Sequence, residues 1–254
     1  MARKTVRLVI IGNEVLSGKV TDTNTPFLLG RLRQLGAVCT GVRIVADEPE
    51  EIAGAVLDAS ARADVVITTG GVGPTHDDIT MESIASAFGV AVEEQPELLS
   101  ALQAHLGEEM TGAQRRLAHA PAGSRLVPGP YFPTVVFRNV YILPGIPALV
   151  RSKVEVLAPE LRGERLPCAA VRTSLRETDL APLLEAALVA APGVDLGSYP
   201  RKGEDGWRVL VTVEGDDRET VDRGVRALLD QLPAEAVVEV VNDFHPEDSG
   251  GLGE

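Results

Sequence analysis

Residues Asp64–Thr80 read DVVITTGGVGPTHDDIT, and the fold expected for the whole chain follows from them. The run Val65–Ile67 is apolar and β-branched, which is typical of a strand buried on both faces. Three glycines, Gly70, Gly71 and Gly73, follow closely. A turn with few side chains at the carboxyl end of a parallel strand is where open α/β sheets bind ligands. The stretch therefore predicts a parallel strand, a ligand-binding turn and a helix.

The polar residues of this stretch point to phosphate and a cation. Backbone N–H groups in such a turn can approach a phosphate closely. Asp77 and Asp78 would place two carboxylates beside it, which is how Mg²⁺ is commonly held next to a phosphate. Asp77 is a second metal ligand or a charge at the helix N-terminus, and Thr80 is expected to cap that helix. The alternative interpretation is a tight turn with solvated acids.

Strands and helices alternate on both sides of this stretch, which predicts a mixed, mostly parallel sheet covered by helices on both faces. Apolar runs indicate the strands, and apolar residues at three- and four-residue spacing indicate the helices. The expected strands are residues 5–11, 37–45, 65–67, 124–127, 134–137 and 140–143, and the expected helical segments are 25–35, 48–61, 94–121 and 148–161.

A linker at residues 162–167 predicts a second domain. The pattern beyond it indicates strands at 168–173, 195–199, 207–214 and 237–241 and helices at 178–190 and 218–231. This β-α-β-β-α-β order is typical of a ferredoxin-like α+β unit. We expect a three-layer α/β domain over residues 1–163, a smaller ferredoxin-like domain over 166–243, and a disordered tail over 244–254.

The composition limits the classes of partner. The 254 residues carry a formal net charge of -13, which argues against nucleic acid because phosphate backbones are bound by basic surfaces. Cys39 and Cys168 are too few and too far apart for a disulfide framework or a zinc site. No stretch approaches the ~20 apolar residues of a membrane span. We expect a cytoplasmic protein that binds neither nucleic acid nor membrane.

Four segments together resemble the molybdopterin-binding fold family, which includes molybdenum-cofactor biosynthesis proteins and the competence/damage-inducible protein A group. They are TTGGVGPTHDDIT, the loop GNEVLSGKVTDTN, ADEPEEI with Asp47, and the turn LPGIP. The segments MTGAQRRLAHAP, NVYILPGIP and VDLGSYP are similar to the molybdopterin-binding-like domain of eukaryotic FAD synthases. The resemblance runs from about Thr5 to Val241.

This resemblance implies a nucleotide pyrophosphatase that acts on FAD, giving FMN and AMP, or on ADP-ribose. Breaking a P–O–P bond requires charge neutralisation and an oriented water. Asp78 and Asp47 match the aspartates of the family's motifs and are the expected catalytic residues and, with Asp77, the expected metal ligands. The residues expected to contact substrate are Gly12, Glu14, Asp22, Asn24, Thr69, Gly70, Gly71, Gly73, Pro144 and Gly145.

The expected cofactor is a divalent metal, Mg²⁺ or a transition metal such as Co²⁺, with K⁺ as a further candidate. The expected ligand is a dinucleotide or a pterin, and the resemblance implies a homo-oligomer, a dimer. Two alternatives to the pyrophosphatase remain open. One is a non-catalytic pterin- or nucleotide-binding protein, and the other is a molybdenum-cofactor biosynthesis enzyme. Ile146 stands where the molybdenum-cofactor enzymes usually carry a polar residue such as Asn, which favours the pyrophosphatase.

Overall fold

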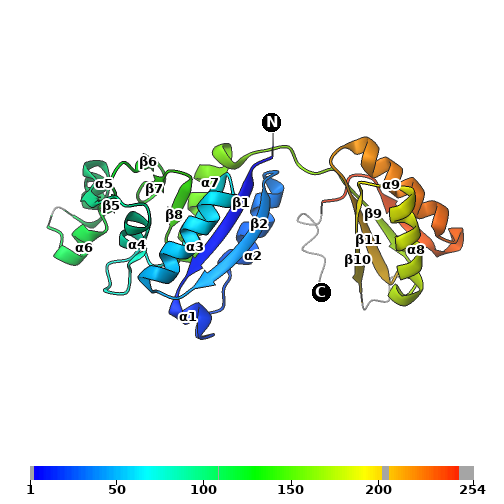
Figure 1. Ribbon diagram of the computed structural model, residues 1–254, viewed down its shortest axis with the longest axis horizontal. Helices are drawn as coiled ribbons and strands as arrows, with labels where there is room; N and C mark the ends of the chain where they lie inside the picture. The colour runs from blue at the N-terminus through cyan, green and yellow to red at the C-terminus, as the bar shows by residue number, and fades with distance from the viewer. Residues whose placement is uncertain (1–2, 108, 202–205, 246–254) are drawn as a thin grey trace. The chain divides into compact units, whose positions relative to one another are not determined.

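The chain divides into two compact units between Glu164 and Arg165, as drawn in the computed structural model of Figure 1. The structure describes residues 3–107, 109–201 and 206–245. None of the helices in these ranges is long and apolar enough to cross a bilayer. The strands of the first unit are β1 Thr5–Ile11, β2 Val38–Val45, β3 Val65–Thr69, β4 Val92–Glu94, β5 His119–Pro121, β6 Arg125–Val127, β7 Thr134–Phe137 and β8 Val140–Leu143. Its helices are α1 Asn13–Leu16, α2 Asn24–Gln34, α3 Pro49–Arg62, α4 Thr80–Ala87, α5 Pro96–Leu106, α6 Gly112–Arg116 and α7 Pro147–Leu161.

The first unit is built on a six-stranded sheet with the order β2-β1-β3-β8-β7-β6. The first four of these strands are parallel, and β7 and β6 are antiparallel to their neighbours. The carboxyl ends of β1, β3 and β8 therefore meet at one edge, which we call the carboxyl edge. This is the mixed, mostly parallel sheet that the sequence predicted.

Helices cover both faces of this sheet, because the strands are apolar on both sides (Figure 1). On one face α2 and α7 pack their leucines and valines against Val6, Leu8 and Ile10 of β1. On the other face α3, α4 and α5 pack against Val9 and Ile11 of the same strand. Alternate residues of β1 thus enter two different cores, which makes the domain three-layered.

The prediction of a helical segment over residues 94–121 is wrong in part. The segment holds two helices, α5 and α6, and its ends form the antiparallel pair β4–β5. Gly107, at a φ of +97°, follows the last residue of α5, and a capping box between Thr111 and Gln114 begins α6. The pairing of Glu94 with His119 is non-local, and no short-range pattern announces it.

The second unit has the ferredoxin-like order predicted from the sequence. Its elements are β9 Cys168–Thr173, α8 Glu177–Ala190, β10 Asp195–Pro200, β11 Val209–Glu214, α9 Arg218–Gln231, the short 3₁₀ helix Ala234–Ala236 and β12 Val237–Val241. The strands form one antiparallel sheet, β10-β11-β9-β12. The predicted disordered tail is wrong at Phe244, because its N–H donates to the Cys168 carbonyl (2.9 Å) and its ring is buried beside Leu210. Residues 246–254 lie outside the described residues.

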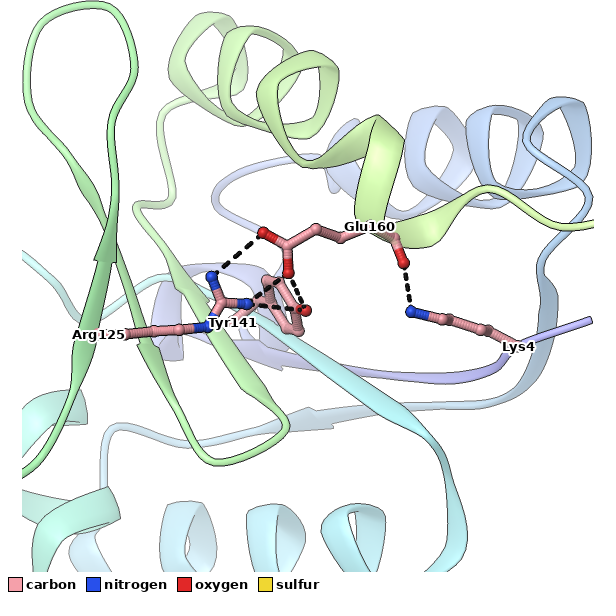
Figure 2. Close-up of polar contacts among 4 residues, drawn as sticks. All are labelled: Lys4, Arg125, Tyr141 and Glu160. Carbon is pink, nitrogen blue, oxygen red and sulfur yellow. Dashed lines mark hydrogen bonds and ion pairs between the residues drawn. The ribbon is translucent and has the colours of Figure 1, made fainter.

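A polar cluster ties α7 to the first sheet at the amino ends of β1 and β8 (Figure 2). The Glu160 carboxylate accepts hydrogen bonds from Arg125 and, at 2.8 Å, from the Tyr141 hydroxyl. Lys4 Nζ donates to the Glu160 carbonyl. The hydrogen bond from Arg125 is the main reason that the pKa of Glu160 lies below its ordinary value. The cluster lies away from the carboxyl edge, so its role is stability.

We expect Glu160→Gln to destabilise the protein by about 1 kcal/mol at pH 7, because its carboxylate is partly exposed and such pairs are weak. The pKa of Glu160 is lowered on folding, so its contribution is complete above the unfolded-state value and is lost as the pH falls through the folded-state pKa. Wild type and variant should therefore converge in urea-unfolding experiments on acidification. Glu155 lies on the same helix as Glu160 and pairs with Arg31 of α2, and its side chain is more exposed than that of Glu160. Glu155→Gln should therefore cost about 0.5 kcal/mol or less. A difference for Glu160→Gln that does not shrink at low pH would contradict this account.

Candidate functional site

The turn after β3 packs against three other segments of the first unit. Gly70 has a φ of +101°, and a Cβ there would lie 2.0 Å from the Ile11 carbonyl oxygen. Its N–H donates to the Leu143 carbonyl (3.2 Å), and its own carbonyl accepts the Thr80 hydroxyl (2.9 Å). Gly70 is therefore required by the close approach of β1, and its N–H is not available to a phosphate as the sequence had suggested.

The prediction that Thr80 caps the following helix is wrong. Thr80 is the first residue of α4, and its buried hydroxyl donates to Gly70 rather than accepting a helix N–H. The hydroxyl lies so close to Gly71 that a Cβ on that glycine would be 2.3 Å away. Because α4 begins at Thr80, Asp77 precedes the helix and is not in its first turn. Its side chain is 63% exposed, beside His76.

The Asp78 carboxylate closes the loop between Gly71 and Asp78. Its Oδ2 accepts the backbone N–H of Thr75 (2.9 Å) and also the Thr75 hydroxyl. A Cβ on Gly73 would lie 2.3 Å from the same oxygen. Within the part of the chain that the structure describes, Asp78 Oδ1 and the N–H groups of Gly71, Val72 and Gly73 make no hydrogen bond. The loop thus offers three donors and one carboxylate oxygen to a ligand.

Two hollows lie at the carboxyl edge, and the two sequence neighbours of Gly70 line one each. Thr69 contributes to the first, and Gly71 contributes to the second. The first, the Thr69 hollow, is lined by Ile10, Ile11, Glu14, Val15, Val20, Thr21, Asp22, Thr23, Asn24, Thr69, Gly145 and Pro147. The second, the Arg116 hollow, is lined by Gly71, Val72, Gly73, Asp78, Met81, Glu82, Arg116, Leu117 and His119.

Two polar residues of the Thr69 hollow shape its wall. Asp22 Oδ1 accepts the N–H groups of Asn24 (2.9 Å) and Thr25 (3.0 Å), so this carboxylate, one residue before the N-cap residue Thr23, satisfies the first two N–H groups of α2. The Asn24 amide donates to the Gly145 carbonyl (2.8 Å), which fastens the turn after β8 to α2. The structure thus brings Asp22, Asn24 and Gly145 together, and it uses part of their hydrogen-bonding capacity to build the hollow.

Of the remaining predicted residues, Gly12, Glu14 and Asp47 lie around the short helix α1, and Pro144 follows β8. Asp47 Oδ2 accepts the N–H of Asn13 (2.7 Å), which fixes the start of α1 at the carboxyl end of β2. The Glu14 carboxylate folds back over Gly12, where a Cβ would lie 2.6 Å from Glu14 Oε1. Glu14 lines the Thr69 hollow, whereas Asp47 and the buried Pro144 line neither hollow. Asp47 is therefore placed to position Glu14.

The Thr69 hydroxyl is buried in the wall of the Thr69 hollow and has no hydrogen-bond partner among the described residues. An unsatisfied buried polar group costs about 1–3 kcal/mol, so native structures seldom keep one without a reason. The hydroxyl oxygen itself is covered, so a ligand in the hollow can pair with it only after a small shift of the wall. No signal in the sequence distinguishes Thr69 from Thr68, whose hydroxyl is also buried and unpartnered but does not line the hollow.

We expect Thr69→Val to raise the stability of the protein without ligand by about 1 kcal/mol, because a methyl group of similar shape replaces an unsatisfied hydroxyl. The same change should weaken the binding of ADP-ribose about tenfold, because one hydrogen bond to the ligand is lost. Thr68→Val is the matched control, and it should change stability alone. Thermal melts and isothermal titration calorimetry measure both quantities, and equal loss of binding in the two variants would contradict the assignment.

A metal at this edge would need ligands from the substrate. No three acidic, histidine or cysteine side chains among the described residues are grouped so that they could hold a metal ion, so Asp47, Asp77 and Asp78 do not form a ready cluster. Mg²⁺ is commonly bound by one or two carboxylates together with substrate phosphates and waters. The unengaged Asp78 Oδ1, beside the three loop N–H groups, fits that pattern.

The sequence did not indicate Arg116 and His119 as site residues. Both lie in the segment MTGAQRRLAHAP, and the structure brings them to the loop after β3 because β5 pairs with β4 next to α4. The expectation of one helical segment over residues 94–121 concealed this return of the chain. The only available signal was the doubled arginine, Arg115–Arg116, close to the single histidine of this segment.

Two family models match the chain, one in each unit. Residues 7–163 match a probable molybdopterin binding domain, and residues 165–241 match the middle domain of FAD synthase. The boundary between these matches coincides with the division of the structure into two units.

Several known proteins are similar to the chain over both units. A protein of Archaeoglobus fulgidus is 33% identical over 224 residues, covering 86% of this chain and 94% of its own length. A probable FAD synthase of Caenorhabditis elegans is 32% identical and covers 92% of this chain. A CinA-like protein of Geobacter is 36% identical and covers 75%. This chain spans about half the length of the last two, 51% and 50%.

One solved structure is similar to the first unit. The crystal structure of the protein CinA from Thermoplasma acidophilum, whose function is described as unknown, aligns with a TM-score of 0.59 and 27% identity. The alignment covers 63% of this chain and 98% of that one.

Proposed function

Because this chain belongs to the family of probable molybdopterin binding domains and continues into a FAD synthase middle domain, we propose that it is a metal-dependent nucleotide pyrophosphatase. Its substrate is an ADP-linked pyrophosphate, either FAD, which gives FMN and AMP, or ADP-ribose. The FAD synthase relatives support the choice of a flavin dinucleotide. Pyrophosphate hydrolysis is the proposed reaction class, and an experiment decides between FAD and ADP-ribose as the substrate.

The observation that carries the proposal is the loop between β3 and α4. In the part of the chain that the structure describes, the N–H groups of Gly71, Val72 and Gly73 and Asp78 Oδ1 make no hydrogen bond, and all four lie in one loop. Phosphoryl transfer needs positioning and charge stabilisation more than covalent chemistry by the protein. Donors fixed in a loop can bind phosphate oxygens without reorganisation during the reaction. Asp78 then orients the attacking water or holds the cation.

The Thr69 hollow provides the second part of the substrate site. It lies next to the loop and carries the Glu14 carboxylate and the unpartnered Thr69 hydroxyl. A dinucleotide whose pyrophosphate lies on the loop would extend one half into this hollow. Asp47 acts through Asn13, as a residue that positions Glu14. A divalent metal bound to Asp78 and to the phosphates would neutralise the charge on the leaving phosphate.

The proposal is tested by incubating the purified protein with FAD, ADP-ribose and NADH. Each substrate is supplied with Mg²⁺, with Co²⁺ or with EDTA, and AMP is measured by chromatography. Release of AMP that requires the metal supports the reaction class, and the ratio between substrates identifies the preferred one. Absence of AMP with every metal would overturn the proposal.

The alternative is a protein that binds a pterin or nucleotide without turnover. It is favoured by the description of the family that matches residues 7–163. Ile146, which is 60% exposed in the turn after β8, offers no side-chain hydrogen bond to a pterin. Calorimetric binding of ADP-ribose or of a pterin in the absence of AMP release would decide for this alternative.

A further inference from the structure

Arg116 and the loop after β3 line one hollow, the Arg116 hollow. Arg116 ends α6, and the loop contributes Gly71, Val72, Gly73 and Asp78 to the lining. The Arg116 side chain is 44% exposed. Its one ion pair within the described residues is a loose contact of 3.8 Å to Glu82 of α4. A guanidinium in this position retains donors for another partner.

The preceding arginine shows the contrast. Arg115 forms a two-pronged ion pair with Glu94, with 3.0 Å between Nη2 and Oε1. The hydrogen bond from Arg115 lowers the pKa of Glu94 from its ordinary value. Such bidentate pairs are the strong form of arginine–carboxylate contact. Two adjacent arginines therefore differ in that Arg115 is engaged, whereas Arg116 is held weakly.

His119 lies on the same side of the hollow. Its Nδ1 is 3.2 Å from the Arg115 carbonyl oxygen, which only accepts hydrogen bonds, so we assign the ring proton to Nδ1. This hydrogen bond fixes the orientation of the imidazole at the start of β5. The hollow is thus lined by three loop residues whose N–H groups make no hydrogen bond among the described residues, by a guanidinium and by an oriented ring.

We propose that the Arg116 hollow is the subsite for one phosphoryl group of the substrate, bound between the loop N–H groups and the Arg116 guanidinium. This rests on the proposed function. Glu82 holds Arg116 while the subsite is empty, and the incoming phosphoryl group replaces that contact. Guanidinium groups bind phosphate oxygens in pairs, so Arg116 also fixes the orientation of the phosphoryl group. The Asp78 carboxylate shares the hollow and keeps a cation next to the same phosphate.

The test measures binding of inorganic pyrophosphate in the presence of Mg²⁺ by titration calorimetry, with no turnover required. Arg116→Gln should weaken binding about tenfold to a hundredfold, the usual effect of losing a charge-assisted hydrogen bond. Arg115→Gln is the matched control, because it removes the same charge one residue away, and its effect should stay within twofold. Glu82→Gln should leave binding unchanged or make it tighter, because it removes the competing carboxylate. Arg116→Lys should recover part of the loss.

Each result separates this inference from the proposed function. Equal losses in Arg115→Gln and Arg116→Gln would overturn the subsite, since net charge alone would explain them. Absence of pyrophosphate binding by the wild type would also overturn it. If no AMP is released from any substrate but pyrophosphate binding depends on Arg116, the subsite stands and the hydrolase fails. If AMP is released at the same rate by Arg116→Gln, with unchanged pyrophosphate binding, the subsite alone fails.

Discussion

Replacement of Asp78 by asparagine is expected to lower the rate of AMP release roughly a hundred- to a thousandfold, or about 3–4 kcal/mol of transition-state stabilisation. The amide oxygen of asparagine can still accept the Thr75 hydrogen bonds that close the loop. The loss therefore falls on the charge that holds the cation or orients the water. The measurement is kcat/KM for FAD and ADP-ribose at saturating metal, together with a thermal melt to show that the fold is retained.

Two further variants separate the charge of Asp78 from its role in the loop. Thr75→Val removes the hydroxyl contact but leaves the Asp78 carboxylate, so it should reduce the rate much less. Asp77→Asn removes a charge that is 63% exposed beside the loop, and it should also cost less than Asp78→Asn. If Thr75→Val is as damaging as Asp78→Asn, the aspartate acts by shaping the loop. If Asp78→Asn leaves the rate unchanged, the reaction can stand but the site is elsewhere.

Gly70→Ala is expected to destabilise the first unit by about 3–5 kcal/mol, combining overpacking with left-handed backbone strain. Its Cβ would lie 2.0 Å from the Ile11 carbonyl oxygen at a φ of +101°. That oxygen belongs to the backbone of β1, where Ile11 pairs with Val45 of β2, so it cannot move without disturbing the sheet. The loss is a large fraction of the stability of a typical domain. Urea unfolding followed by circular dichroism measures it.

Gly89→Ala is the control for this prediction. Gly89 also has a positive φ, +67°, but a Cβ there would meet nothing within 4 Å. It should therefore cost only the backbone strain, about 1 kcal/mol. The difference between the two variants measures the steric contact at the junction of β1, β3 and α4. Equal costs for both would show that this junction is not tightly packed.

Local patterns were sufficient to predict most of the fold. The buried strands carry continuous β-branched runs, as in Val65–Ile67, and such runs give the strand and its burial without knowledge of the neighbours. The alternation with amphipathic helices then indicated a mostly parallel sheet, because parallel neighbours need a crossover. The motif residues around Gly70 and Asp47 also sufficed to indicate the family, which the two matches confirm.

The errors lie where the partner of a residue is distant in the chain. The pairing of β4 with β5 depends on a contact between residues 92–94 and 119–121. The fixed position of Phe244 depends on its hydrogen bond to Cys168. The roles of Thr80 and Gly70 depend on each other and on Ile11. No pattern of neighbouring residues determines such contacts.

The sequence alone was sufficient to predict a candidate ligand site at the carboxyl edge, because it places Gly71, Gly73, Asp78 and Glu14 after the expected parallel strands. Only the tertiary structure decided which polar groups at this edge are paired within the fold and which are left for a ligand. It commits the Gly70 N–H to Leu143, leaves the Thr69 hydroxyl without a partner among the described residues and brings Arg116 to the loop from the later helix α6. The physical reason is that hydrogen-bond capacity is assigned by packing: a polar group is available to a ligand only if the folded chain leaves it unpaired.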